Sequence, residues 1–408
     1  MSNKKVVVVG IGYVGLPLAL TLAKVGYTVT GVDINKKTIE SINDGMMPIK
    51  EKDLETLFNE PIVRKNFKGS DEPNKADVFI ICVQTPMDTI SKQPDLSYVS
   101  SATESVAPFL EKGNLIIIES TVPPFTCRKV VKPLVEKATG LTVGKDIFLA
   151  HCPERIMPGE TLKELVYNNR ICGGINKESA IFAEEIYKSF VKGDIDVTDD
   201  VTAEMVKLME NTYRDVNIAL ANEFSLIGET LKVDVRDAIR FANKHPRVKI
   251  LSPGIGVGGH CLPKDPWYLV YADPKNTTLI AMARKVNESM PERVAAKLRK
   301  MVRDVDNPKI IVLGMTYKPD SDDLRESPSL EIIRLLKEDG YNVTAYDNYV
   351  KGHEYTSILD LARGADCVTV LVEHTSIVKE VEANKKQILA SMKTPIFFRV
   401  GQSDKPIS

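Results

Sequence analysis

The chain lacks the cysteine spacing that marks a zinc site or a disulfide framework. Its six cysteines are scattered over 408 residues, and none stands in a CxxC pair. Charge of one sign is also missing, because the formal net charge is only −1. Such a balance gives no long-range field that would attract nucleic acid or an anionic membrane. We therefore expect no metal and no nucleic-acid partner, and an anionic small ligand must be bound by local cations.

Long apolar runs are absent as well. No run approaches the ~20 residues that span a bilayer, and the first residues, MSNKKVVVVG, lead into a strand without the pattern of an export signal. Scattered thiols are typical of a reducing compartment, so a cytoplasmic protein is expected. A chain of 408 residues is too long for one core and should form two or three domains.

The first forty residues carry a dinucleotide-binding pattern. An apolar run at 6–9 leads into the turn GIGYVG and then into residues at helical spacing. A second strand, 27–32, ends at Asp33, about 20 residues on, where a carboxylate binds the ribose hydroxyls of NAD. Asp33 would repel a ribose phosphate, although Lys36 and Lys37 weaken this preference for NAD over NADP. The alternative is a turn that only packs helix on strand. The predicted cofactor contacts here are Gly10, Gly12, Tyr13, Val14, Gly15 and Asp33.

Three further apolar strands are predicted, each followed by a polar cluster. They cover 77–83, 114–119 and 146–150, and the clusters after them are QTP, STVP and CPER. Ligands of open α/β sheets bind beyond the carboxyl ends of the strands. We expect these clusters to line a cofactor and substrate crevice.

The rest of the chain predicts a long helix and a second α/β unit. Residues 199–231 contain no proline and one glycine, which predicts a helix that joins domains or packs on a partner subunit. Lys207, Asn211 and Arg214 share one face of it. A strand at 309–314 then starts a second unit without the glycine fingerprint. The predicted fold is α/β, with two Rossmann-like doubly wound parallel-sheet domains, 1–195 and 305–408, joined by a central helical domain, 196–304.

One cysteine stands in a distinctive loop. The segment SPGIGVGGHCLPKDPWY, residues 252–268, places Cys261 behind four glycines and four residues ahead of Asp265. A loop nearly free of side chains presents a thiol to a ligand, so Cys261 is the predicted nucleophile. His260 is adjacent in an extended loop and therefore points away, which makes it a poor base for its neighbour. Packing roles are expected for Cys82, Cys152, Cys172 and Cys367, and the role of Cys127 stays open.

Six segments together resemble the nucleotide-sugar 6-dehydrogenases, the family of the UDP-glucose and GDP-mannose dehydrogenases. They are GIGYVGLP (10–17), ESTVPP (119–124), PERIMPG (153–159), KLMENTYRD (207–215), GVGGHCLPKDP (256–266) and YKPDSDDLRESP (317–328). The resemblance covers essentially the whole chain, and NTYRD with GGHC is most similar to the branch that oxidises UDP-N-acetylmannosamine.

This resemblance implies oxidation of the sugar C6 alcohol to a carboxylate in two hydride transfers to NAD. A thiolate that adds to the intermediate aldehyde makes the second transfer possible, which fits Cys261. Lys207 and Asn211 would stabilise the oxyanion, Asp265 would position or deprotonate water, and Glu154 and Thr121 match a carboxylate and a hydroxyl near the sugar. Which group takes the first alcohol proton stays open.

The resemblance also assigns binding residues. Lys318 would contact the nucleotide of the substrate, and Arg325, with Thr85 and Thr121, the cofactor. Arg247 matches an arginine that reaches a neighbouring subunit's site, which implies a homodimer. Further substrate contacts are expected from Gly258 and His260 and from Arg155 and Arg214, whose alternative is structural ion pairing with Asp215, Glu210 or Glu154.

Other functions stay open at this point. The alternative sugar nucleotides are UDP-N-acetylglucosamine and UDP-glucose, and Arg214 with the residue before Cys261 argues against glucose. A hydroxyacid dehydrogenase would need only the lysine and asparagine and would make one NADH per substrate. A nucleotide-sensing protein would bind NAD without turnover. Cys261 and the stoichiometry of NADH distinguish these alternatives.

Overall fold

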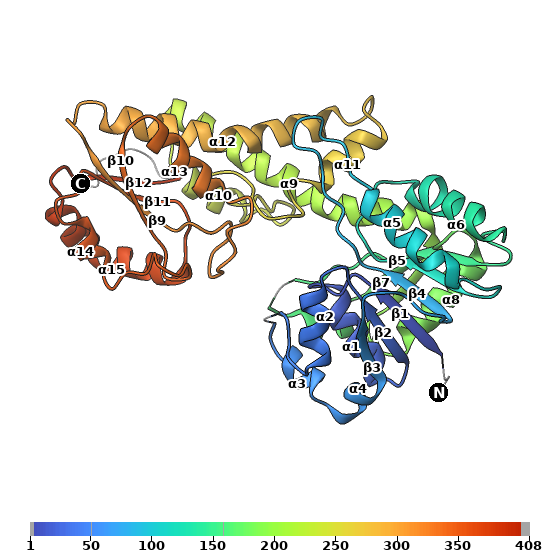
Figure 1. Ribbon diagram of the computed structural model, residues 1–408. Coiled ribbons are helices and arrows are strands. Elements are labelled where there is room, and N and C mark those ends of the chain that lie inside the picture. Colours follow the sequence, from blue (N-terminus) through green and yellow to red (C-terminus); the bar gives the residue numbers. More distant parts are fainter. Residues whose placement is uncertain (1–3, 50, 158, 401–408) are drawn as a thin grey trace. The chain divides into compact units, whose positions relative to one another are not determined.

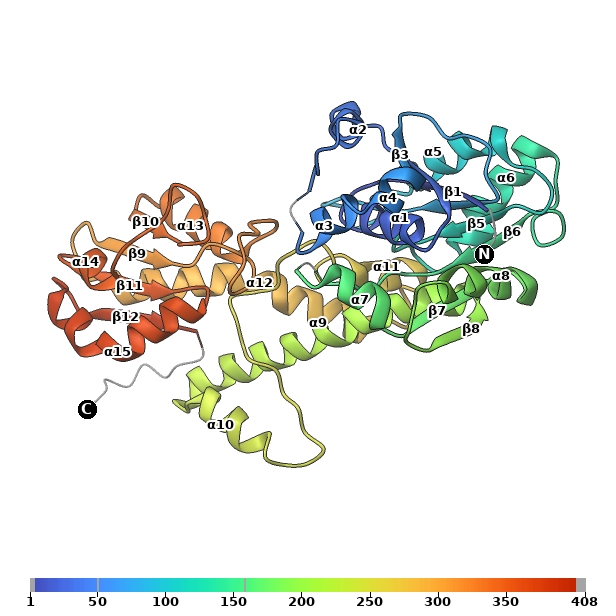
Figure 2. The same cartoon turned by 90° about the horizontal axis from the view of Figure 1, so that it is seen from below.

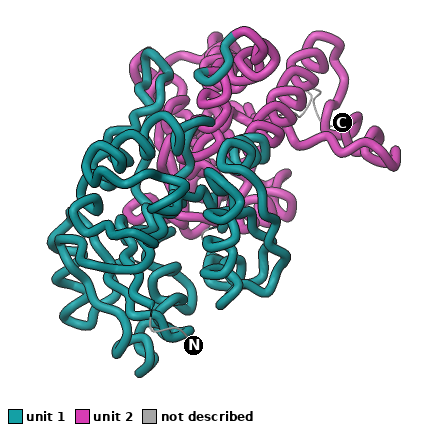
Figure 3. The backbone as a smooth tube through the Cα atoms, turned by 90° about the vertical axis from the view of Figure 1, so that its right-hand side faces the viewer, with its two compact units in different colours: residues 1–210, 271–274 teal, residues 211–270, 275–408 magenta. Residues whose placement is uncertain are grey.

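The structure, a computed structural model, describes residues 4–49, 51–157 and 159–400. The chain forms two compact units. Unit 1 comprises 1–210 with 271–274, and unit 2 comprises 211–270 with 275–408. Figure 3 colours them teal and magenta. Within the described residues, no helix is long and apolar enough to cross a membrane.

Unit 1 contains an eight-stranded sheet in the order β3-β2-β1-β4-β5-β6-β7-β8 (Figure 1). The strands are β1 (Lys5–Val9), β2 (Thr28–Val32), β3 (Phe67–Ser70), β4 (Val78–Ile81), β5 (Leu115–Ile118), β6 (Phe148–His151), β7 (Arg170–Gly174) and β8 (Ile195–Asp199). All pairings are parallel except that of β6 with β7. The expected parallel sheet is confirmed with this one exception, which arises because the connection through α7 returns to the sheet at the end where β6 stops.

Both faces of this sheet are covered. Val6 and Val8 pack into one apolar core, and Val7 and Val9 into the core on the opposite face. An apolar run without alternation is therefore what the strand needs. The helices of unit 1 are α1 (Gly15–Lys24), α2 (Lys36–Asn43), α3 (Leu54–Phe58), α4 (Pro61–Asn66), α5 (Ser97–Val106), α6 (Lys132–Thr139), α7 (Thr161–Tyr167) and α8 (Lys177–Lys188), with short helical turns at Ala107–Phe109 and Cys127–Val131.

A 32-residue helix, α9 (Asp200–Leu231), begins in unit 1 and continues into unit 2, as its sequence predicts. It is followed by α10 (Val235–Ala242) and α12 (Thr278–Val302) in unit 2, and between them by α11 (Asp265–Ala272), whose last two residues belong to unit 1. A buried polar cluster joins α9 to α12. Arg284 donates to Asp215 at 2.6 Å, and Asn287 donates to the same carboxylate at 2.9 Å. Burial raises the pKa of Asp215, although Arg284 opposes this effect.

The remainder of unit 2 is the second α/β fold. Its parallel sheet has the order β10-β9-β11-β12, formed by β9 (Lys309–Leu313), β10 (Asn342–Tyr346), β11 (Cys367–Val370) and β12 (Ile396–Arg399). The helices are α13 (Pro328–Glu338), α14 (Ile358–Ala362) and α15 (Thr375–Ser391). Figure 2 shows α13 and α15 on opposite sides of this sheet. The predicted repeat of the first architecture is present, with the turn after β9 at the same place as the turn after β1.

Candidate active site

The glycine turn of unit 1 has the form that a dinucleotide site requires. Gly10 has φ +88°, and a Cβ on it would lie 2.7 Å from the carbonyl oxygen of Cys82. A Cβ on Gly15 would lie 2.0 Å from the carbonyl oxygen of Gly10. A Cβ on Gly12 would meet no atom within 4 Å. The outer glycines therefore serve the packing of the turn, whereas the middle one leaves its backbone open to a ligand.

The surroundings of the turn also fit NAD. No side chain caps the start of α1, and its first turn holds no acidic residue, so its amino end is suited to a pyrophosphate. Asp33 follows β2 and accepts hydrogen bonds from the backbone N–H groups of Ile11 (3.1 Å) and Asn35 (2.9 Å). Tyr13 is 53% exposed and Val14 half-buried. The residues present match the cofactor that the sequence predicts.

The loops after β4 and β5 are joined to each other. Thr85 donates from Oγ1 to the carbonyl oxygen of Thr121 at 2.8 Å, and Ser120 donates to that of Val83 at 2.7 Å. The registers pair Val9 with Ile81, Ile81 with Ile118 and Ile118 with His151, so the loops after these strands lie at one edge of the sheet. This confirms that Thr85 and Thr121 lie together beyond the carboxyl ends of the strands.

Glu154, the predicted carboxylate near the sugar, is buried in a charged cluster. It pairs with Arg170, and its Oε1 accepts the backbone N–H of Arg155 at 2.7 Å. Arg170 also binds Glu119 at 3.0 Å, and Glu119 accepts from Tyr187. Burial raises the pKa of Glu119 despite Arg170. Sequence reasoning missed Arg170, because it begins the unpredicted strand β7.

Arg155 has the ion-pair contacts that were the alternative to substrate binding. Its guanidinium donates to Glu210 at 2.7 Å and to the carbonyl oxygen of Asn169. Both terminal nitrogens of the Arg155 guanidinium therefore have acceptors within the protein. Arg214, by contrast, is exposed on α9, and its neighbour Asp215 pairs with Arg284 instead.

Lys207 is half-buried on α9, one turn after a buried glutamate that the sequence did not single out. Glu204 accepts the backbone N–H groups of Phe125 (2.5 Å) and Cys127 (2.9 Å) and so ties the loop after β5 to α9. Burial raises the pKa of Glu204 to about 7, against the effect of these donors. The buried Cys127 thiol has its pKa raised by burial and by Glu204, which gives it the properties of a packing residue.

Unit 2 contains the predicted nucleophile, Cys261, and two of its predicted partners, Asp265 and Asn211. Cys261 is exposed, whereas four of the other five cysteines are buried and Cys82 is half-buried. The carbonyl oxygen of Cys261 accepts from the N–H of Asp265 at 2.9 Å, which begins α11. Asp265 is buried, and its Oδ2 accepts from Nδ2 of Asn211 at 2.6 Å. Cys261 thus lies one turn before the amino end of α11, a place in the chain where negative charge is stabilised.

The glycine loop packs against the segment after β9. A Cβ on Gly258 would lie 2.5 Å from the carbonyl oxygen of Glu326, and one on Gly259 would lie 2.9 Å from the ring of Tyr317. Gly259 also donates its N–H to the carbonyl oxygen of Arg325 at 3.1 Å. These glycines allow the close approach of two backbones. His260 is exposed, and its pKa is lowered by partial burial and then by Arg325 and Lys264.

Three predicted cations of unit 2 have different surroundings. Lys318 is half-buried after β9. Arg325 forms a bidentate pair with Asp323, at 2.8 and 2.5 Å. Arg247 is exposed in the segment that follows α10. The described residues contain no cluster of histidine, cysteine and carboxylate side chains that could bind a metal.

Comparison with known proteins defines the class. The UDP-glucose/GDP-mannose dehydrogenase family matches in three parts: its NAD binding domain at residues 4–191, its central domain at 201–289 and its UDP binding domain at 311–402. The chain belongs to this family of NAD-dependent nucleotide-sugar dehydrogenases, as its motifs predict. NAD as cofactor and a UDP-linked sugar as substrate class follow from the two binding domains.

Individual relatives are similar over nearly their whole length. The UDP-N-acetyl-D-mannosamine dehydrogenase of Methanococcus maripaludis is 48% identical over 404 residues, which cover 97% of this chain and 92% of the relative. The solved structure of UDP-D-ManNAc dehydrogenase from Pyrococcus horikoshii has a TM-score of 0.89 and 43% identity, and covers 99% of this chain and 97% of that one. The NDP-N-acetyl-D-galactosaminuronic acid dehydrogenase of Ralstonia nicotianae is 41% identical over 381 residues, 90% of each chain.

Proposed function

We propose that the chain oxidises UDP-N-acetyl-D-mannosamine at C6 to the uronate, with release of two NADH per sugar. The observation that carries this proposal is the exposed Cys261 beside the contact of Asn211 with Asp265. A single oxidation of an alcohol needs no thiol, whereas oxidation of an aldehyde needs a nucleophile that adds to it. The name of the 48% identical relative supports the sugar.

The chemistry follows from the residues. Two NAD, bound one after the other, would supply the hydride acceptors for the two oxidations. After the alcohol has become an aldehyde, the Cys261 sulfur adds to its carbon and forms a thiohemiacetal. Loss of a second hydride from that carbon leaves a thioester. Water then attacks the thioester, which releases the carboxylate and returns the thiol.

The neighbouring groups have defined roles in this scheme. The Asn211 amide is held by Asp265 at 2.6 Å and is proposed to donate to the oxyanion. Lys207, one helical turn earlier on α9, supplies the positive charge, and loss of one such donor costs about 2.7 to 4 kcal/mol of barrier. Asp265 is proposed to position the hydrolytic water. Thr121 and Glu154 are proposed near the sugar, with Glu154 acting from within its pair with Arg170.

Binding of the two nucleotides is proposed to follow the domain plan 1–195, 196–304 and 305–408. The turn 10–15, Asp33 and Thr85 would hold NAD, and Arg325 would reach toward it. Lys318 would bind the UDP part of the substrate. Gly258, His260 and Arg214 would contact the sugar, where the N-acetyl group offers a carbonyl oxygen to an arginine.

A homodimer is proposed from the apolar face of unit 2. Tyr213, Leu220, Ile227 and Leu231 lie at helical spacing on α9, and each is at least 41% exposed. Between α9 and α10 lies an apolar groove of about 270 Å³, lined by residues such as Phe224 and Ile239. A second copy of this chain would cover this face and bring its Arg247 to the first copy's sugar.

The proposed location is the cytoplasm, because the mechanism requires Cys261 in its reduced form. The uronate formed there would serve the synthesis of surface polysaccharide. Both statements rest on the proposed reaction.

The test of the reaction is the yield of NADH from a panel of UDP-N-acetylmannosamine, UDP-N-acetylglucosamine, UDP-glucose and GDP-mannose. Two NADH per UDP-N-acetylmannosamine, with little from the others, is expected. Cys261→Ser should lower the rate of acid formation at least ~10³-fold, whereas Cys367→Ala, which alters a buried thiol, should keep the stoichiometry. One NADH per substrate, or full acid yield from Cys261→Ser, would refute the covalent route.

The dimer has its own test. Sedimentation should give a dimer that Leu220→Glu splits. Mixing the inactive Arg247→Ala and Cys261→Ser proteins should restore activity, because one site of the mixed dimer holds both native residues. No restoration would show that Arg247 does not act across the interface.

A further inference from the structure

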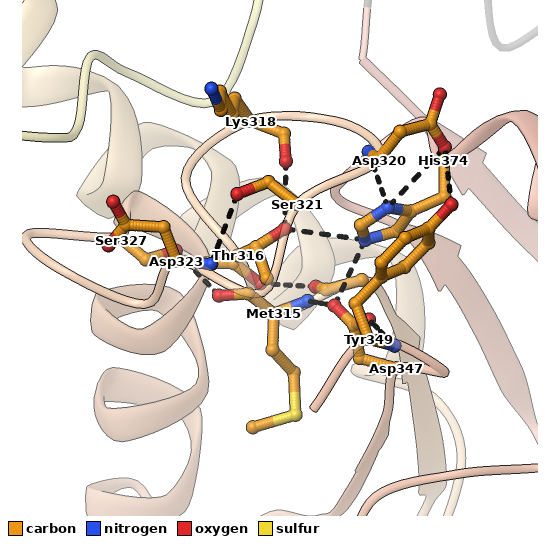
Figure 4. A network of polar contacts seen from close by, with 12 residues as sticks. Met315, Thr316, Lys318, Asp320, Ser321, Asp323, Ser327, Asp347, Tyr349 and His374 are labelled. Atoms are coloured by element: carbon orange, nitrogen blue, oxygen red, sulfur yellow. Dashed lines mark hydrogen bonds and ion pairs between the residues drawn. The ribbon is translucent and has the colours of Figure 1, made fainter. Parts of the chain in front are cut away.

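A buried histidine lies beside the segment that carries Lys318 (Figure 4). His374 precedes α15 and has no exposed surface. Its Nδ1 accepts the backbone N–H of Asp320 at 2.9 Å, and its Nε2 lies 3.0 Å from Oδ2 of Asp347 and 3.3 Å from Oγ1 of Thr316. Because a backbone N–H can only donate, Nδ1 holds a lone pair. The ring proton is therefore on Nε2, where it faces Asp347 and Thr316.

The imidazole is fixed from several sides. Asp347 also accepts the N–H groups of Met315 at 2.7 Å and Tyr349 at 2.9 Å. The ring of Tyr349 stacks on His374 with centroids 4.7 Å apart. Burial alone would raise the pKa of Asp347, but the hydrogen bonds from His374 and the two N–H groups hold it below its usual value. A neutral ring is thus held in one orientation by an ionised carboxylate and an aromatic face.

Two bonds connect this ring to the segment 316–320. Oγ1 of Thr316 lies 3.3 Å from Nε2 of the ring, and Asp320 donates its N–H to Nδ1. The Thr316 hydroxyl in turn donates to the carbonyl oxygen of Lys318 at 2.9 Å. Asp320 has φ +54°, a backbone conformation that costs energy for a residue with a side chain. Its carboxylate in turn accepts the N–H of Thr375 at 2.8 Å. Lys318 therefore lies between two residues that are both anchored to His374.

The same segment supports the cysteine loop. Tyr317 donates its N–H to the carbonyl oxygen of Asp323 at 3.0 Å, which closes the loop that contains Arg325. Gly259 donates to the carbonyl oxygen of Arg325, and the Tyr317 ring packs on Gly259. A shift of 316–320 would be transmitted to the backbone two residues before Cys261.

We propose that His374 is a positioning residue that sets both the Lys318 segment and the support of the Cys261 loop. Its assignment to this reaction rests on the proposed function. Its effects on the position of the Lys318 segment and on the support of the Cys261 loop do not. The alternative role, a polar group that only stabilises the fold near α15, would leave nucleotide affinity and thiol reactivity unchanged in a folded variant.

Three substitutions separate the contacts of the ring. His374→Phe keeps the stack on Tyr349 and removes both hydrogen bonds. His374→Asn keeps an acceptor near the place of Nδ1, and His374→Gln keeps a donor near that of Nε2. His353→Phe is the matched control, because His353 lies in the same domain and its ring has, among the described residues, only the carbonyl oxygen of Ala345 as a hydrogen-bond partner.

Two measurements need no turnover. One is the dissociation constant of UDP by calorimetry, and the other is the rate at which iodoacetamide alkylates Cys261, assigned by its loss in Cys261→Ser. His374→Phe should weaken UDP binding about tenfold and change the alkylation rate at least threefold, with NAD affinity unchanged. His374→Asn should recover most of both, since it retains the bond from Asp320. With substrate, KM should rise more than kcat falls, because the displaced segment carries Lys318, the proposed contact of the UDP part.

The outcome that overturns the proposal is a folded His374→Phe protein with native UDP affinity and native alkylation. If that variant does not fold, Thr316→Val decides, because it removes only the hydroxyl between His374 and the Lys318 carbonyl oxygen; native values for both measurements in Thr316→Val would also overturn it. A protein that yields no NADH but shows both changes would refute the proposed function and leave the positioning role standing.

Discussion

The two α/β folds start with the same turn and use it differently. Gly10 and Gly314 both have φ +88°, and each donates its N–H across to the end of the second strand, to Val32 at 2.7 Å and Tyr346 at 2.9 Å. Asp33 and Asp347 each follow that strand and accept the N–H of the residue after the glycine. The two folds therefore share a glycine turn that is held by hydrogen bonds to the second strand and its aspartate. This turn by itself is not a cofactor site.

The difference lies in what occupies the space beyond the turn. In the first fold α1 begins at Gly15, directly over Gly10, and leaves the backbone of Gly12 open. In the second fold the segment 315–327 lies between the turn and α13, and the carboxylate of Asp347 is hydrogen-bonded to His374. Side chains of the protein thus fill the place where the first fold receives a ligand, which explains why only one of the two carries the dinucleotide fingerprint.

The largest expected effect tests the glycine turn that the two folds share. Gly10→Ala and Gly314→Ala each place a Cβ 2.7 Å from a carbonyl oxygen, of Cys82 and of Val372. With the positive φ, each should destabilise its fold by at least ~3 kcal/mol, seen as a lowered unfolding temperature in calorimetry. Gly12→Ala, whose Cβ meets nothing, is the control and should keep stability but weaken NAD binding. Equal stability of all three would break the comparison.

Buried carboxylates give the next effect, with opposite pH dependence in the two units. The native pKa of Glu204 is about 7, against an ordinary 4.5, so the native state keeps a proton that the unfolded state releases in this range. Wild type should lose about 3 kcal/mol relative to Glu204→Gln as pH rises from 4.5 to 7.

The matched control is Asp347, whose pKa is lowered from 3.8. Its stabilising contribution is present above that value and is lost only as pH falls below it, so the difference between wild type and Asp347→Asn should not change between pH 5 and 8. Urea unfolding at several pH values measures both. A flat Glu204 difference would show that its carboxylate is not buried in solution.

The two strand-end aspartates provide a third test. Asp33→Asn should raise the NAD dissociation constant about tenfold, with a small change in stability, because the half-buried carboxylate is kept for a ribose. Asp347→Asn should leave NAD binding unchanged and lower stability by about 2 kcal/mol, since its amide would face N–H donors. Isothermal calorimetry and thermal unfolding separate the outcomes. An exchange of the two phenotypes would contradict the assignment.

Sequence reasoning succeeded where chemistry is local. The apolar runs at 6–9 and 310–313 are strands because both faces of each sheet are covered, which is the environment that a run without alternation requires. The exposure of Cys261 followed from its glycines, since a loop without side chains cannot bury it.

It failed where partners are distant along the chain. The strands β3, β7 and β8 contain few apolar residues, as in FKGS and IDVTD, and lie at or near sheet edges where pairing alone holds them. Arg170 and His374 have partners 16 to 58 residues away. No periodicity marks such residues, because topology and not spacing brings their partners to them.

The smallest expected effect concerns the starts of the two helices. A Cβ on Gly15 would lie 2.0 Å from the carbonyl oxygen of Gly10, whereas in the second fold Ser329 stands at the corresponding place and donates from Oγ to the carbonyl oxygen of Gly314 at 2.7 Å. The helix α13 therefore lies farther from its turn, and a hydroxyl bridges the gap. Ser329→Ala should cost about 1 kcal/mol of stability, the value of one buried hydrogen bond, with no change in NAD affinity. A loss well above this in thermal unfolding would mean that the hydroxyl is essential to the turn, and that the second fold tolerates as little change there as the first.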